Sequence, residues 1–110
     1  MAAPAEDLWG DVLFHAQQAA EKSLKAFLAW GDVPFRKTHS LEELGQQCSA
    51  AYPKLVTVTD QAAPLTEYAW KFRYPGEAAE PAGAEAEAAL ASARRVYEAI
   101  LARLPSQSKP

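Results

Sequence analysis

The feature that most constrains this chain is a stripe of apolar residues over positions 7–30, spaced by three and four residues. The stripe consists of Trp9, Leu13, Ala16, Ala20, Leu24 and Phe27. This spacing matches the turn of an α-helix and places these side chains on one face. Gly31 and Pro34 follow, and they indicate that the helix ends there. The sequence therefore predicts a long amphipathic helix that has to bury one face against other elements.

The same spacing returns near the C-terminus and predicts a last helix that extends to Leu104. Its apolar members are Ala86, Leu90, Ala93, Tyr97, Ile100 and Leu104. A pattern of this length is typical of a helix packed along a bundle or along the seam of a dimer. Residues 105–110 are polar, and we expect them to form a disordered tail.

The segment 40–43 has the pattern of a capping box and predicts the start of a second helix. In such a box the Ser40 hydroxyl accepts a hydrogen bond from the Glu43 amide, and the Glu43 carboxylate reaches back to the Ser40 amide. Tyr52 and Pro53 predict the end of this helix, because the residue before a proline is biased away from helical geometry.

Residues 54–64 are ambiguous. The run 55–59 alternates and is rich in β-branched residues, which favours a strand by intrinsic propensity. A single short strand among helices has no partner, so we interpret the run as a connector or as the distorted start of a third helix. Apolar residues at helical spacing then continue to Phe72. The segment 73–76 breaks the chain before a loop that extends to about residue 83.

Length and charge limit the class of protein. The 110 residues predict one domain, 1–110, with a core over about 7–104. A net charge of −3 argues against strong non-specific binding to nucleic acid, which needs many phosphate contacts. The N-terminus does not resemble a signal peptide, and no apolar run approaches the ~20 residues that cross a bilayer. The single Cys48 excludes an internal disulfide, fits a reducing cytoplasm and lies at a core position, so we expect a cytoplasmic protein without membrane contact.

Spacings typical of metal or catalytic sites are absent from the sequence. His15 and His39 are the two histidines, and no His, Cys, Asp or Glu cluster has the spacing of metal ligands. The sequence also has no glycine-rich phosphate loop and no nucleophile elbow. We therefore expect no metal, no cofactor and no catalytic residue.

A polar flank of the first helix is the first candidate binding site. His15, Gln18, Lys22 and Lys25 follow one another at helical spacing. Two ammonium groups and an amide in this arrangement can hold a phosphate or an acidic partner surface. The alternative is a solvated face, on which Glu21 and Lys25 form an i,i+4 pair that contributes only about 0.2–0.5 kcal/mol.

The start of the second helix is another candidate. Lys37 and His39 precede a helix N-terminus, whose amides and partial positive charge favour an anion. The alternative for His39 is a packing role against Leu44 across the first turn.

Arg73 and Tyr74 are the last candidates. Arg73 can bind a phosphate or carboxylate with two hydrogen bonds, and Tyr74 can stack on a base. The alternative is that Arg73 bonds the carbonyls at its own helix end while Tyr74 closes the end of the bundle.

Three segments in this order resemble the HEPN family, named from higher eukaryotes and prokaryotes nucleotide-binding. They are FHAQQAAEKSLKAFL at 14–28, KTHSLEEL at 37–44 and RYPG at 73–76. The resemblance covers roughly residues 8–104. It implies an all-α, up-and-down bundle of four to five helices that is usually dimeric. It also implies that residues 54–64 are more helical than their composition indicates.

The chain departs from the family pattern in two ways. Family members usually have a further N-terminal helical segment, and here only thirteen residues precede Phe14. A shortened or truncated N-terminus exposes apolar surface, so we expect more reliance on self-association. Ribonuclease members use an arginine followed four to six residues later by a histidine. After Arg73 these positions are Glu77, Ala78 and Ala79, so the expected general acid or base is absent.

The resemblance and the residues together predict a non-catalytic HEPN protein that forms a homodimer. It is expected to bind a nucleotide, RNA or a separate minimal nucleotidyltransferase, as in a toxin–antitoxin module. We expect Lys22, Lys25, His39 and Arg73 to contact anionic groups and Tyr74 to contact a ring. The alternatives are a metal-independent RNA-cleaving toxin with a non-standard site, using His39 and Arg73 across a dimer, and a purely structural dimer.

Overall fold

The structure is a computed structural model that describes residues 5–71 and 83–104, and it is all-α. The elements in chain order are α1 (Ala5–Trp30), α2 (Leu41–Ala51), the 3₁₀ helix η1 (Pro53–Leu55), α3 (Val56–Ala62), the 3₁₀ helix η2 (Ala63–Ala69) and α4 (Gly83–Leu101). The described residues contain no strand. The predicted all-α bundle is confirmed.

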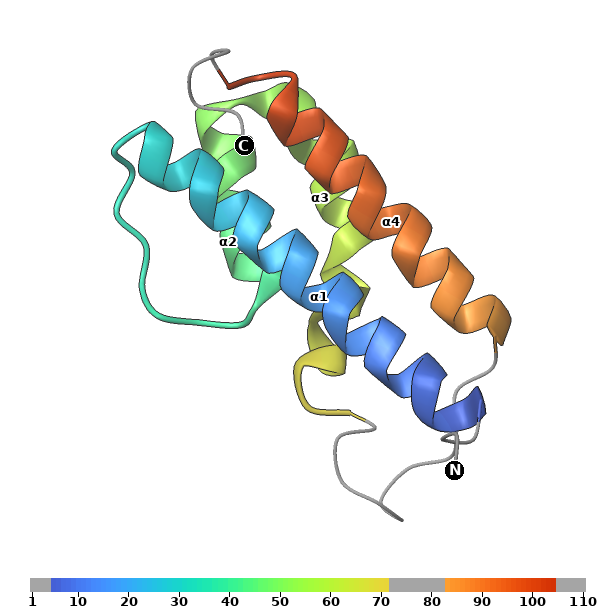
Figure 1. Ribbon diagram of the computed structural model, residues 1–110. Coiled ribbons are helices and arrows are strands. Elements are labelled where there is room, and N and C mark those ends of the chain that lie inside the picture. Colours follow the sequence, from blue (N-terminus) through green and yellow to red (C-terminus); the bar gives the residue numbers. More distant parts are fainter. Residues whose placement is uncertain (1–4, 72–82, 105–110) are drawn as a thin grey trace.

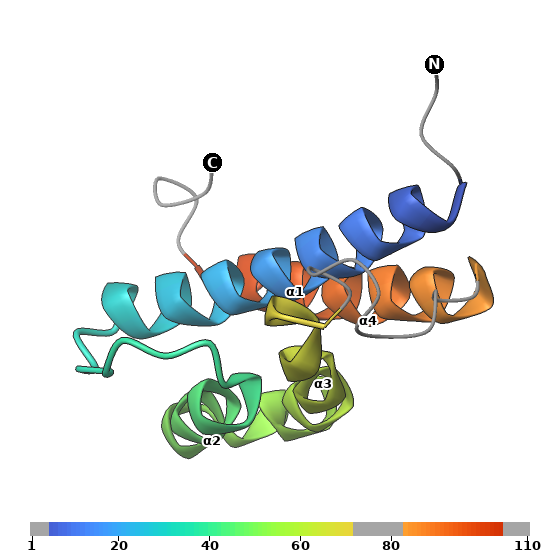
Figure 2. The same cartoon turned by 90° about the horizontal axis from the view of Figure 1, so that it is seen from below.

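The helices form two layers. The long helices α1 and α4 lie side by side along the bundle, and α2 and α3 pack across one face of this pair (Figures 1 and 2). Residues 31–40 return along the bundle, so that α2 begins beside the middle of α1, where the Gln17 side-chain amide donates to the His39 carbonyl at 3.2 Å. As a result α1, α2 and α4 all point toward the same end of the molecule instead of alternating strictly up and down.

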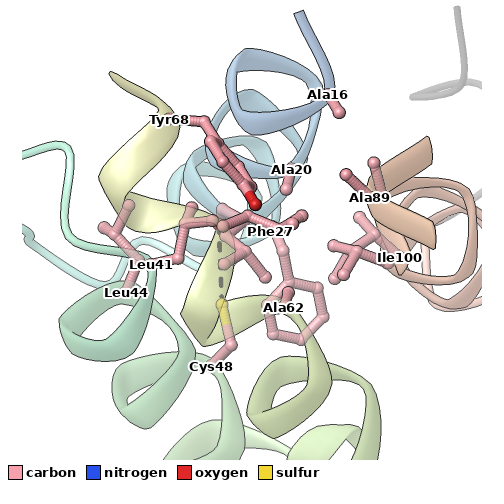
Figure 3. Close-up of a cluster of buried hydrophobic side chains, with 14 of the residues drawn as sticks. Ala16, Ala20, Phe27, Leu41, Leu44, Cys48, Ala62, Tyr68, Ala89 and Ile100 are labelled. Carbon is pink, nitrogen blue, oxygen red and sulfur yellow. Dashed lines mark hydrogen bonds between the residues drawn. The ribbon is translucent and has the colours of Figure 1, made fainter. Parts of the chain in front are cut away.

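The core lies where the two layers meet. Figure 3 shows Cys48 of α2, Tyr68 of η2 and Ile100 of α4 converging on side chains of α1. The fully buried side chains of α1 include Leu13, Leu24 and Leu28. The stripe predicted for the first helix therefore faces the core, as expected from its spacing.

The ambiguous run 54–64 is helical, as the family resemblance implied. Its β-branched residues are accommodated because Thr59 is buried and its hydroxyl is satisfied, donating to the Val56 carbonyl at 3.1 Å and lying 3.0 Å from the Ser49 hydroxyl. Gly45 of α2 allows this close approach, since a Cβ at that position would lie 2.9 Å from the Thr59 Cβ. Tertiary packing therefore overrides the strand propensity of the run.

The first helix ends where predicted, but a different residue terminates it. The left-handed residue is Asp32, with φ of 56°, and not Gly31. The Val33 amide donates to the Leu28 carbonyl at 2.8 Å, and the Asp32 amide donates to the Ala29 carbonyl at 3.1 Å. This is the Schellman pattern, in which an aspartate takes the place usually held by glycine.

Half of the predicted capping box is present at the start of α2. The Ser40 hydroxyl accepts from the Glu43 amide at 3.1 Å, as expected. The Glu43 carboxylate does not reach back, because both of its oxygens accept from the Arg36 guanidinium at 2.8 and 2.9 Å. The Ser40 amide donates instead to the Thr38 hydroxyl at 3.0 Å.

The apolar stripe predicted for the last helix is rotated by part of a turn. Ala89 and Val96 are buried, whereas Leu90 and Tyr97, which the pattern placed inward, remain 46% and 43% exposed. Small residues at Ala86, Ala89 and Ala93 line the inner face, so α4 can lie close against α1. No helix in the described part of the chain is long and apolar enough to cross a membrane. The predicted tail, 105–110, lies outside the described residues.

Candidate functional site

A polar cluster centred on Glu21 lies between α1 and the segment that leads into α2. We call Gln17, Glu21, Lys25 and His39 the Glu21 cluster. Gln17 is 0% exposed and Glu21 is 4% exposed, although both lie on a helix that otherwise buries mainly apolar side chains. Gln17, Glu21 and Lys25 follow one another at i,i+4, so one row of the helix carries all three.

The Glu21 carboxylate receives three contacts. Its Oε1 accepts from the Gln17 amide at 3.0 Å and lies 2.8 Å from His39 Nδ1, while its Oε2 accepts from Lys25 Nζ at 3.1 Å. The Gln17 oxygen accepts in turn from the Gln18 amide at 2.7 Å. The buried charge is therefore paired and hydrogen-bonded, which is the condition under which a carboxylate is tolerated inside a protein.

Two opposing effects set the pKa of Glu21. Burial raises the pKa, because it disfavours the charged form, and the contacts from Gln17, His39 and Lys25 lower it. The contacts prevail, so the pKa of Glu21 lies below its ordinary value. Glu21 is ionised at neutral pH and offsets the charge of Lys25.

Three backbone amides at the start of α2 already have hydrogen-bond partners. The Leu41 amide donates to the Thr66 hydroxyl at 3.0 Å, and the Ser40 and Glu43 amides donate to Thr38 and Ser40. Fewer backbone N–H groups are therefore left to bind an anion at the N-terminus of α2 than the sequence indicated. The alternative packing role of His39 against Leu44 is also not found, since the His39 ring is directed to Glu21 and its side chain is 65% exposed.

The predicted basic flank of the first helix divides into separate parts. Lys25 and His39 meet at Glu21, and Gln18 binds Gln17. Lys22 is exposed and borders a different hollow, next to Tyr97 of α4. His15 is exposed, and its ring lies edge-on to Phe14, with 5.6 Å between centroids. Lys22 and Lys25 therefore do not form one binding site with His39.

We call the hollow beside Lys22 the α1–α4 groove. It has a volume of about 400 Å³ and is lined by Ala19, Lys22, Ser23, Ala26, Tyr97, Ile100, Leu101 and Leu104. The lining is apolar apart from the hydroxyls and the ammonium group of Lys22 at its border. Tyr97 at its edge is 43% exposed, and Leu90, two turns earlier on α4, is a further exposed apolar residue.

Arg73 and Tyr74, the other predicted site residues, lie outside the described residues. Gln17 and Glu21 were missed as members of the site. Their signal in the sequence is that they continue a buried row, Leu13–Gln17–Glu21–Leu24–Leu28, in which two polar residues stand at core positions. A buried polar residue is more informative than an exposed apolar one.

The described residues hold no group of three His, Cys, Asp or Glu side chains that is arranged to bind a metal ion. Cys48 lies in the core, as predicted, and its thiol donates to the Leu24 carbonyl at 3.6 Å. Burial raises the pKa of this thiol to about 12, so Cys48 is not a nucleophile at neutral pH.

Comparison with protein families identifies the fold. The model of the HEPN domain matches residues 4–104, which is nearly the whole chain. The chain belongs to the HEPN family. This result agrees with the three segments that carried the resemblance and with the all-α bundle. No curated protein and no solved structure matches this HEPN chain significantly.

Membership places the chain among domains that are generally nucleotide-binding or related to ribonucleases. Within this HEPN sequence, no histidine follows residue 39, so the arginine–histidine spacing of the ribonuclease members cannot be formed from Arg73. His39 is the one histidine in the Glu21 cluster, and its Nδ1 lies 2.8 Å from the Glu21 carboxylate.

Proposed function

We propose that this HEPN domain acts by binding and not by catalysis, as a homodimer that engages a separate minimal nucleotidyltransferase in a toxin–antitoxin-like module. The observation that carries the proposal is the apolar α1–α4 groove, with Tyr97 exposed at its edge. An exposed apolar groove of this kind marks a protein interface more often than a site for a charged small molecule.

The geometry of α4 suits a dimer. A helix of 19 residues is about 28 Å long, and two such helices side by side can bury the ~800 Å² per partner of a standard interface. An isologous dimer uses the same surface twice, so one substitution on α4 alters both halves of the contact.

Binding of a nucleotide is the second candidate, and the Glu21 cluster is its location. Lys25 and the exposed His39 lie together there, and Lys37 is exposed in the segment just before. Glu21 offsets the charge of Lys25, which favours a weak site for a phosphate over a tight one. Arg73 and Tyr74 are proposed to contribute to the same ligand.

The dimer is tested by light scattering during gel filtration. Tyr97→Asp is expected to convert the dimer to a monomer without loss of helical circular dichroism. Val56→Asp is the matched control, because Val56 is 46% exposed, borders a hollow between α2 and α3 and does not line the α1–α4 groove, so it should leave the dimer intact. A wild-type monomer at micromolar concentration would reject the dimer.

The partner and the chemistry are tested separately. Co-expression with a minimal nucleotidyltransferase should give a stable complex, and calorimetry with AMP and ATP should show whether Lys25→Ala weakens nucleotide binding. Degradation of RNA by the purified protein without metal, abolished by His39→Ala, would replace the proposal by the RNA-cleaving alternative. Absence of both a complex and a nucleotide signal would leave only the structural dimer.

A further inference from the structure

A second hollow lies at the end of the bundle where α1, α2 and α4 finish. We call it the end hollow. Its volume is about 380 Å³, and it is lined chiefly by Phe27, Trp30, Gly31, Tyr52, Ala102 and Arg103. This size falls within the range of ligand pockets. The end hollow shares no lining residue with the α1–α4 groove or the Glu21 cluster.

Three helix C-termini meet at the end hollow. The last residues of α1, α2 and α4 are Trp30, Ala51 and Leu101, and all three helices point to this end of the molecule (Figures 1 and 2). The C-terminus of a helix carries partial negative charge, which favours a nearby cation. None of the three helices has a basic residue in its last turn, so this charge is not offset from within the helices.

The walls of the end hollow are aromatic. Trp30 is 47% exposed, and its ring lies 6.2 Å from the ring of buried Phe27. Tyr52 forms the wall on the α2 side. The faces of such rings attract cations, and a guanidinium is favoured because it is planar and stacks on them.

The chain already places one guanidinium there. Arg103, two residues beyond α4, has its Cζ 5.0 Å from the centroid of the Tyr52 ring and donates to the Tyr52 hydroxyl at 2.5 Å. Arg103 is exposed, so it can leave this position without unfolding the core. Arg103 therefore shows that the end hollow can bind a guanidinium group. It also occupies part of the hollow.

We propose that the end hollow is a docking site for an arginine side chain of a partner protein, and that Arg103 competes with this arginine in the free chain. The proposal is independent of the homodimer and of the nucleotide site. Negative partial charge from three helix ends and exposed aromatic faces favour a cation here, and they disfavour a phosphate.

The test follows the three indole N–H signals in ¹H–¹⁵N spectra of the full chain, assigned with Trp9→Phe, Trp30→Phe and Trp70→Phe. Titration with Nα-acetyl-arginine amide at millimolar concentration is expected to shift the Trp30 signal along a saturable curve. Trp70 is the internal control, because it is 55% exposed and lies outside the end hollow. The neutral isostere Nα-acetyl-citrulline amide should leave Trp30 unchanged.

Arg103→Ala sharpens the test, because it removes the internal competitor. Affinity for Nα-acetyl-arginine amide is expected to rise about fivefold, in line with the loss of one exposed cation–π contact. Tyr52→Leu should abolish the shift of Trp30. Two results overturn the proposal: no shift of Trp30 at saturating probe, or a shift of Trp30 by AMP that Arg103→Ala abolishes. Neither result bears on the dimer, which is measured through Tyr97.

Discussion

The two long helices, α1 and α4, have the same apolar spacing but bury different chemistry. The inner face of α1 includes Gln17, Glu21 and Ser23 among its buried residues. The buried residues of α4 are Ala86, Ala89, Ala93, Val96 and Ile100. Helix α1 therefore carries a polar cluster that is bonded to His39 of the segment before α2, whereas α4 contributes small residues that allow close packing.

The difference teaches that helical spacing alone does not reveal what a buried face does. A buried polar row holds neighbouring elements in register, because each hydrogen bond is costly to leave unmade. An alanine row sets the distance between helices, because any larger side chain has to displace the neighbour. Four substitutions test this contrast, from the largest expected effect to the smallest.

Leu24→Asp should unfold the domain. Leu24 is 0% exposed in the middle of α1, so the substitution buries a charge without a partner and costs several kcal/mol of a total of about 5–15. The loss is measured by urea denaturation followed by circular dichroism. Ala91→Asp introduces the same group at an exposed position of α4 and should change stability by about 0.5 kcal/mol or less.

Ala93→Leu should destabilise by about 1–3 kcal/mol, because the added atoms overfill the contact between α4 and α1. Ala91→Leu adds the same atoms on the exposed side and should be nearly neutral. Both are measured by thermal unfolding. Equal stability of the two variants would show that the alanine row does not set the distance between the helices.

Glu21→Gln should cost about 1–2 kcal/mol at neutral pH, because it removes charge from the hydrogen bonds with Lys25 and His39. The pKa of Glu21 is lowered in the folded protein, so its contribution is fully present above its ordinary value of 4.5 and is lost as the pH falls through the folded pKa. The difference in the free energy of unfolding between the wild type and Glu21→Gln should therefore become smaller as the pH falls.

Urea denaturation at several pH values between 7 and 3 measures this difference. The control is Glu87→Gln, which alters an exposed carboxylate of α4 and should give a difference near zero at every pH. A difference for Glu21→Gln that stays constant with pH would contradict the role assigned to its ionised form.

Ser40→Ala should have the smallest effect, about 1 kcal/mol, through loss of the bond from the Glu43 amide at the start of α2. Ser40→Asp keeps an acceptor at this position and should retain most of the stability. The comparison is made by thermal unfolding, and equal losses in the two variants would show that the cap contributes nothing.

The helices could be predicted from the sequence because spacing and caps are local properties. The start of α2 at Ser40 and its end before Pro53 depend on neighbours within a few residues, and both are correct. The face of α4 that is buried, in contrast, does not depend on neighbours in the sequence. Ala86, Ala93 and Ile100 fit two overlapping stripes, one with Leu90 and Tyr97 and the other with Ala89 and Val96. The choice between them depends on how closely α1 approaches.

The candidate site was predictable only in part, for the same reason. Lys25 and His39 were recognised by their chemistry, and the structure brings them together. Only the alternative interpretation of the basic flank included their common partner, Glu21, and it put Glu21 on a solvated face. The burial of Glu21 could not be predicted, because it depends on residues 31–40 returning beside α1. Helical spacing alone grouped Lys22 with Lys25, although Lys22 borders the α1–α4 groove instead.

The pairing of α1 with α4 has a consequence for the order of events during synthesis. The first helix is translated well before the element that covers its flank, residues 83–101. Until α4 has been made, part of the apolar surface at Leu13, Ala16 and Ala20 is exposed, and chaperones can bind to it. Truncation before Gly83 should therefore yield a product that aggregates or is degraded, and not a smaller folded domain.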